Sequence, residues 1–316
     1  PKPLDSEQLR MRIDDVRLLL EKAVQADKTV PEAYYNLGRF FIYNNKLDGA
    51  IENLTEAINR FKTAAPMTAR RTMQYVDAMR LLGEQLVMQK KYLDAQTLYA
   101  DALNIYRDYT AFKPLPPNRN IGKLYADYGD IDYFISYNFD SALDSYQHAV
   151  KELYNTPSVN YRIGYIQYQQ ENYQQAIEAI SRAYAGKAND KNVMYGFGNA
   201  FFKRGDYFAA LALYEQLLGA LNIQRSRKDY AMSSTRPDDA AFMEQYMHVV
   251  NNLGATLSRL AERTGDSQKH GRALALYAEA TRAWDALTRN PQTMIRAKSV
   301  GFCGFGRFEH NGAFRV

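Results

Sequence analysis

Six segments of the chain repeat one spacing of small and large residues. In each segment a glycine is followed after about twelve residues by an alanine, four positions later by a large residue, and three positions later by Ala or Leu. The six matches begin at Gly38, Gly83, Gly129, Gly164, Gly198 and Gly254. The third has one additional residue before its alanine, Ala142, and the sixth has seven before Ala273. This regular recurrence indicates an array of similar structural units.

Each unit is predicted to be a pair of antiparallel helices. Apolar residues recur at helical spacing on both sides of a short polar break, such as Asn44-Asn45-Lys46 or Arg204-Gly205-Asp206. We expect the glycine and the alanine to let the two helices approach closely, and the large residue to fill the space toward the next unit. Because one pair cannot bury its apolar face alone, neighbouring pairs must stack. The sequence therefore predicts an all-α fold.

The spacing resembles that of the tetratricopeptide repeat (TPR) family. The family pattern consists of a large residue, Leu-Gly, an aromatic residue and three further small or large residues. In the first unit it is matched by Tyr34, Leu37, Gly38, Phe41, Ala50, Leu54 and Ala57. The fourth and fifth glycines are 34 residues apart, which is the family period. The family's proline at the end of each unit is absent from most units here. The resemblance implies a right-handed α-solenoid of stacked antiparallel helix pairs, with about six TPR units plus caps, and says little about function.

The repeats predict how the chain is divided. A TPR superhelix is expected over 1–295, with units at about 31–61, 76–107, 122–155, 157–190, 191–222 and 247–286. An N-terminal cap is expected at 5–28, insertions at about 62–75, 108–121 and 219–246, and a tail outside the repeats at 296–316. The second insertion contains Pro114, Pro116 and Pro117, which favour an extended connector.

The reactive residues form no recognisable catalytic or metal-binding pattern. A single cysteine, Cys303, excludes an internal disulfide framework, and the four histidines are widely scattered. Asp127, Asp130 and Asp132 lie close together, but they do not follow the spacing of a calcium loop, and we expect them on a solvated helix face. We therefore expect a protein that is not an enzyme and that has no metal and no cofactor.

Charge and hydropathy exclude further classes of protein. The formal net charge is +5, and the whole excess lies beyond residue 224, which gives a mild preference for acidic partners. This excess is too diffuse to predict nucleic-acid binding, and no apolar run is long enough to predict a membrane-spanning segment. The chain begins with Pro1 rather than Met, so we expect a processed or shortened form. Both the cytoplasm and the periplasm stay open, as does the oligomeric state.

The resemblance also implies a partner-binding surface. In TPR units, positions two, five, nine, twelve and thirteen of the first helix line a concave groove. Carried over, with the neighbouring Arg162, these positions give the candidates Tyr35, Arg39, Tyr161, Arg162, Tyr165, Tyr168, Tyr195, Asn199, Lys203 and Asn251, and the second unit adds Arg80 and Glu84. Tyrosine offers a large apolar area and a hydroxyl, and asparagine offers both a donor and an acceptor. As an alternative, Tyr168 belongs to the core, because position twelve often faces the neighbouring helix.

The main functional hypothesis is a non-catalytic scaffold or adaptor for protein–protein interaction. A protein or peptide would bind in the groove, within a larger assembly such as a bacterial envelope, secretion or motility complex. Two alternatives remain open at this point. One is a regulatory sensor that binds a small ligand or a signal peptide in the groove, and the other is the regulatory arm of an enzyme.

Overall fold

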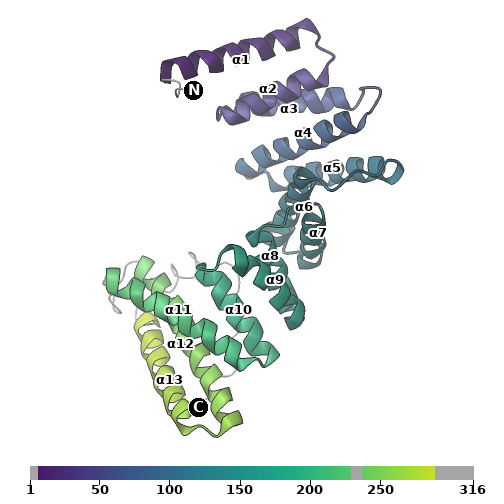
Figure 1. Ribbon diagram of the computed structural model, residues 1–316. Helices are drawn as coiled ribbons and strands as arrows, with labels where there is room; N and C mark the ends of the chain where they lie inside the picture. Colours follow the sequence, from purple (N-terminus) through teal and green to yellow (C-terminus); the bar gives the residue numbers. More distant parts are fainter. Residues whose placement is uncertain (1–5, 229–236, 289–316) are drawn as a thin grey trace. The chain divides into compact units, whose positions relative to one another are not determined.

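The fold consists of α-helices arranged in successive pairs. The computed structural model describes residues 6–228 and 237–288, which form thirteen α-helices, one π-helical turn and no strand (Figure 1). This confirms the predicted all-α solenoid of helix pairs. The predicted tail at 296–316 and the middle of the predicted insertion at 219–246 lie outside the described residues.

The helices belong to two compact units, of which the first comprises Pro1–Asn155. It contains α1 (Ser6–Ala26), followed by the pairs α2 (Pro31–Tyr43) with α3 (Leu47–Phe61) and α4 (Ala69–Met88) with α5 (Tyr92–Phe112). The third pair is α6 (Arg119–Ile131), which continues into the π-helical turn η1 (Asp132–Ser136), with α7 (Phe139–Lys151). The first helices α2, α4 and α6 are neighbours in space, since α4 contacts both of the others.

The second compact unit comprises Thr156–Val316 and contains three further pairs. These are α8 (Pro157–Gln169) with α9 (Tyr173–Gly186), α10 (Lys191–Arg204) with α11 (Tyr207–Lys228), and α12 (Pro237–Thr264) with α13 (Ser267–Thr288). Much of the sequence between the regular repeats lengthens helices: α4 starts early, α5 ends late, and α11 and α12 extend toward each other along the chain. None of the described helices is long and apolar enough to cross a membrane.

The repeated glycine and the repeated large residue are in direct contact within one helix pair. An ideal Cβ placed on Gly83 would lie 2.1 Å from Cε1 of Tyr99, and one placed on Gly198 would lie 2.7 Å from Cε1 of Tyr214. Both tyrosines are fully buried. The large residue therefore packs on the glycine of its own unit.

The turn inside each helix pair has one residue in the left-handed backbone region. In four units this residue follows the repeated glycine by seven positions, and it is Asn45, Lys90, Glu171 or Gly205. In the third unit it follows by eight positions, at Tyr137, because η1 accommodates the additional residue as a π turn. In the sixth it follows by eleven, at Gly265, because α12 is longer by about one helical turn.

Candidate functional site

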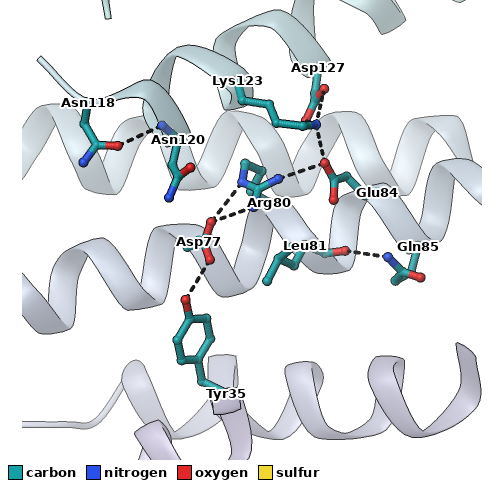
Figure 2. A network of polar contacts seen from close by, with 10 residues as sticks. All are labelled: Tyr35, Asp77, Arg80, Leu81, Glu84, Gln85, Asn118, Asn120, Lys123 and Asp127. Atoms are coloured by element: carbon teal, nitrogen blue, oxygen red, sulfur yellow. Dashed lines mark hydrogen bonds and ion pairs between the residues drawn. The ribbon is translucent and has the colours of Figure 1, made fainter. Parts of the chain in front are cut away.

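The first helices of the first compact unit carry a continuous chain of polar contacts, here called the polar ladder (Figure 2). Its members are Tyr35 on α2, Asp77, Arg80 and Glu84 on α4, and Lys123 and Asp127 on α6. Spacings of three and four residues place the three α4 members on one face of α4. A spacing of four places the Lys123–Asp127 pair on one face of α6. The ladder therefore joins three successive repeats through side chains.

Arg80 connects the first half of the ladder. The Tyr35 hydroxyl donates a hydrogen bond of 2.7 Å to Oδ2 of Asp77. Nε and Nη2 of Arg80 donate to Oδ1 of the same carboxylate at 3.0 and 2.8 Å, and Nη1 donates to Oε1 of Glu84 at 2.8 Å. The Arg80 side chain is only 9% exposed, so these contacts satisfy a nearly buried cation.

Lys123 connects the second half. Its Nζ donates to Oδ1 and Oδ2 of Asp127 at 3.0 and 2.8 Å, and also to Oε1 of Glu84. Burial raises the pKa of the Asp127 carboxyl to about 6, and the Lys123 ammonium offsets only part of this effect. Burial, with the Asp77 charge, also raises the pKa of the Tyr35 phenol. Arg80 and Lys123 are thus both paired with carboxylates inside the ladder.

A depression of about 250 Å³ lies beside the ladder, and several polar groups border it. Its lining includes Tyr35, Asp77, Arg80, Arg70, Gln74, Asn118 and Asn120. Oε1 of Gln74 is buried without a hydrogen-bond partner among the described residues. Asn118 caps α6 by accepting from the backbone amide of Asn120, and Figure 2 shows both side chains near Asp77 and Arg80. The buried Gln74 acceptor, the half-buried Asn118 and the exposed Asn120 place amide groups in this depression, and amide groups can both donate to and accept from an extended peptide backbone.

The second compact unit contains a different polar cluster, which is buried. Nδ2 of Asn252 donates to the Tyr195 hydroxyl and to Oδ1 of Asn199, both at 2.9 Å. The Tyr214 hydroxyl donates to the same Asn199 oxygen at 2.5 Å. Burial raises the pKa of Tyr195 to about 12, so its phenol stays neutral at physiological pH. The cluster holds α10, α11 and α12 together through satisfied amide and hydroxyl groups.

The sequence-predicted groove residues divide into buried and accessible ones. Tyr35, Tyr168, Tyr195 and Asn199 are buried, and the alternative of a core position for Tyr168 agrees with this placement. The others are half-buried or exposed: Arg39, Tyr161, Arg162, Tyr165, Lys203 and Asn251. Their contact with a partner stays a prediction.

Local contacts already orient several of these accessible residues. The Arg39 guanidinium lies 5.3 Å from the centroid of the Tyr35 ring. The Tyr161 hydroxyl donates to the backbone carbonyl of Asn192 at 3.4 Å, and Nδ2 of Asn251 donates to Oδ1 of Asn252 at 3.4 Å. Tyr161 and Tyr165 also pack against the core that includes Tyr195.

The expectation of a solvated acidic face is wrong for two of its three members. Asp132 is 2% exposed and accepts from Gln96 Nε2 at 2.7 Å and from Ser141 Oγ at 2.5 Å. Asp127 is largely covered and belongs to the ladder. Lys123 stands four residues before Asp127, and this spacing was the signal in the sequence that could have identified the pair.

No set of three His, Cys, Asp or Glu side chains in the described part of the chain is placed to hold a metal ion. A sequence profile of the tetratricopeptide repeat matches residues 137–192. The chain also shares its fold with a tetratricopeptide repeat protein from Parabacteroides merdae, at a TM-score of 0.52 and 16% identity, with 86% of this chain and 94% of that chain covered. Residues 137–192 thus match the tetratricopeptide repeat, and the chain has the fold of tetratricopeptide repeat proteins.

Another solved TPR structure with the same fold is that of YrrB, which is described as having an unusual peptide-binding site. It matches at a TM-score of 0.50 and 16% identity, over 63% of this chain and 91% of YrrB. No curated protein sequence matches the chain. TPR arrays are in general non-catalytic scaffolds for protein–protein interaction, and the repeats and the fold of this chain support that class of function.

Proposed function

We propose that this protein is a non-catalytic scaffold or adaptor that binds a segment of a partner protein along the first helices of its repeats. The depression beside the polar ladder carries this proposal. There, the buried Gln74 acceptor and the amides of Asn118 and Asn120 border a rigid, internally paired set of charges. An extended peptide backbone can both donate to and accept from such groups, and rigid partners lower the cost of ordering on binding.

The second compact unit would contribute an aromatic surface. Tyr161 and Tyr165 lie four residues apart on α8, with Arg162 beside them, and all three are partly accessible. We propose that they contact the partner together with Lys203 and Asn251. In this arrangement Tyr168, Tyr195 and Asn199 do not contact the partner. They are buried, and they hold in place the helices that carry the accessible residues.

The partner would belong to a larger assembly, such as a bacterial envelope, secretion or motility complex. The helices that extend beyond the regular repeat support this proposal, because they offer additional surface. Phe112 at the end of α5 is 87% exposed, and Ile223 on the extended part of α11 is also exposed. Exposed large apolar side chains of this kind are candidates for further contacts.

The test is affinity capture with the whole chain as bait, followed by quantitative mass spectrometry. The double variant Gln74→Ala with Asn120→Ala removes amides beside the ladder. Gln147→Ala removes an exposed amide from the second helix α7 and serves as the matched control. We expect the wild type and the control to retain the same protein in stoichiometric amount. The double variant should retain at least about tenfold less of it.

Other outcomes would contradict the proposal in different ways. Equal capture by the double variant and the wild type would place the contact elsewhere on the molecule. A low-molecular-weight compound released from the purified wild type on denaturation, with no protein retained, would favour the sensor for a small ligand.

A further inference from the structure

Helix α1 has the spacing of the second helix of a repeat, and the described residues include no first helix ahead of it. Three of its residues each stand 34 residues before a residue of α3, and the pairs are Val16 with Ala50, Leu20 with Leu54, and Ala23 with Ala57. This distance is the period of the tetratricopeptide repeat. Figure 1 shows α1 at the end of the first compact unit, where it packs on α2, the first helix of the following pair. The side of α1 that would meet a first helix of its own is therefore open.

The three repeat positions are covered in the complete pairs but not in α1. In α3, α5, α7, α9 and α11 the residues at these positions are only 0% or 1% exposed. In α1, Val16 is 46% exposed, Ala23 is also exposed, and Leu20 is half-buried. The difference arises because each of the other second helices is paired with a first helix.

The open side of α1 is apolar. Leu19 is 67% exposed and lies three residues after Val16 and four before Ala23, so the three side chains share one helix face. Met11 and Leu18, at 55% and 50% exposure, extend the apolar surface around the helix. A helix that only capped the array would present a polar outer face, as terminal repeats of solenoid proteins do. Neighbouring exposed apolar side chains of this kind indicate an interaction surface.

The repeat also indicates which kind of element fits this face. In the first complete pair, α2 covers α3 with a glycine, and an ideal Cβ on Gly38 would lie 2.8 Å from Cγ of Leu54. The repeated positions of α2 follow the helical spacing i, i+3, i+4, i+7, and they are Tyr34, Leu37, Gly38 and Phe41. Leu20 is the same residue type as Leu54 in the same register, so a helix with this pattern would meet α1 as α2 meets α3. The open face thus continues an interface that each complete pair already contains.

We propose that α1 binds an amphipathic helix of a partner protein, which takes the place of the missing first helix. This helix runs antiparallel to α1 and carries glycine or alanine opposite Leu20, with large apolar residues four and one positions before it and three positions after it. A second copy of this chain offers no such helix among the described residues, because α2, α4, α6, α8, α10 and α12 are each paired with their own second helix. The inference goes beyond the proposed function, since it uses no residue of the polar ladder or of the depression beside it.

The whole chain and a synthetic first helix test this inference by fluorescence anisotropy. The probe is a peptide with the sequence of residues 29–46, acetylated and amidated at its ends and labelled with fluorescein on its C-terminal lysine. A control peptide carries Gly38→Leu. In the whole chain, Leu19→Glu places a charge on the open face, and Ala23→Leu adds apolar area but prevents close approach of a helix. Leu274→Glu, at a position of α13 that is 56% exposed, is the matched control for the added charge.

We expect the wild type and Leu274→Glu to bind the probe with the same Kd. Leu19→Glu should weaken binding at least about tenfold, because it places a charge in the contact. Ala23→Leu should also weaken it severalfold, although it adds apolar area, because the helices can no longer approach closely. The control peptide should bind the wild type at least about tenfold more weakly than the probe. All three substituted positions of the chain are exposed, and thermal melting verifies that each variant is folded.

Several results would overturn the inference, and all of them leave the proposed function standing. One is the absence of saturable binding of the probe to the wild type. Another is equal binding to the wild type, Leu19→Glu and Ala23→Leu, which would mean that the probe displaces the chain's own α2 or binds elsewhere. A wild-type dimer in light scattering that Leu19→Glu converts to a monomer would assign the face to a second copy. A photoreactive side chain in place of Leu19 that cross-links a monomer to itself would assign the face to another segment of the chain.

Discussion

At the scale of single residues, two glycines of the second compact unit differ in the space available for an added methyl group. An ideal Cβ on Gly198 would lie 2.7 Å from Cε1 of Tyr214, whereas one on Gly219 meets nothing within 4 Å. The Tyr214 ring is fully buried and its hydroxyl is bound to Asn199, so it cannot easily move. We expect Gly198→Ala to lower the free energy of unfolding by about 1–3 kcal/mol. Gly219→Ala should raise it by about 0.5–1 kcal/mol, because alanine favours the helix. Urea unfolding of both variants measures the difference, and equal midpoints would contradict the observed packing.

Asp127 should make the stability of the protein depend on pH. Burial raises its pKa to about 6 in the folded state, compared with about 3.9 in an unfolded chain. Between these values the folded state binds the proton and the unfolded state does not, so the contribution of this group to stability falls as pH rises from about 4 to about 6 and is constant above. The difference in unfolding free energy between the wild type and Asp127→Asn should therefore fall over this range, by on the order of 2 kcal/mol. Urea unfolding at pH 4.5, 6 and 7.5 would measure it, and a constant difference would show that the carboxyl titrates normally.

At the scale of the helix pair, the left-handed turn residue should limit stability wherever it is not glycine. This conformation costs an ordinary residue about 1–2 kcal/mol relative to glycine. Gly205 has a φ of 91°, and a Cβ there would meet only the end of Arg263, at 3.6 Å. Gly205→Ala should destabilise the protein by about 1 kcal/mol through the backbone alone. Lys90→Gly, at the equivalent position with a φ of 62°, should stabilise it by up to about 1 kcal/mol. Thermal melting of the two variants should show shifts of opposite sign, and shifts of the same sign would contradict the assignment.

The π turn should be removable without loss of the repeat. Deleting Ile135 shortens the distance between Gly129 and Ala142 to the regular twelve residues. Because Ile135 is 40% exposed while Tyr133 remains in the core, we expect the turn to close as a regular α-helical one. Far-UV circular dichroism should then show the same helical content as the wild type. Loss of helical content on deletion would instead show that the π turn is required for folding of this pair.

These elements also show what the sequence could and could not predict. The period of the apolar residues and the contact between Gly83 and Tyr99 are local consequences of helix geometry, so the spacing predicted the pairs. The one additional residue before Ala142 was visible in the sequence, but spacing alone does not say whether a loop, a bulge or a π turn accommodates it. The accessible and buried members of the groove could not be distinguished from the sequence, because Tyr165 and Tyr195 are both tyrosines at predicted groove positions of their units. Which of them is covered depends on how neighbouring pairs stack.

At the scale of the whole molecule, a destabilising change should affect mainly the helix pairs next to it. Within each compact unit, substantial helix contacts join helices that are adjacent along the chain or separated by one helix. In such an array, stability is approximately the sum of unit terms and nearest-neighbour terms. A defect in one pair should therefore increase the opening of its neighbours more than that of distant pairs. The positions of the chain that a partner stabilises can be identified in the same way.

Hydrogen exchange measured by mass spectrometry tests this locality with two variants that make the same kind of change. Gly83→Leu overpacks the pair α4–α5 against Tyr99, and Gly198→Leu overpacks α10–α11 against Tyr214. We expect Gly83→Leu to accelerate amide exchange mainly in α2–α7, and Gly198→Leu mainly in α8–α13, with each variant leaving the far end of the other compact unit close to wild type. Uniform acceleration along the whole chain in both variants would show that the array unfolds as one cooperative block. The first outcome would also mean that a partner bound at the polar ladder protects the first unit while the second continues to open independently.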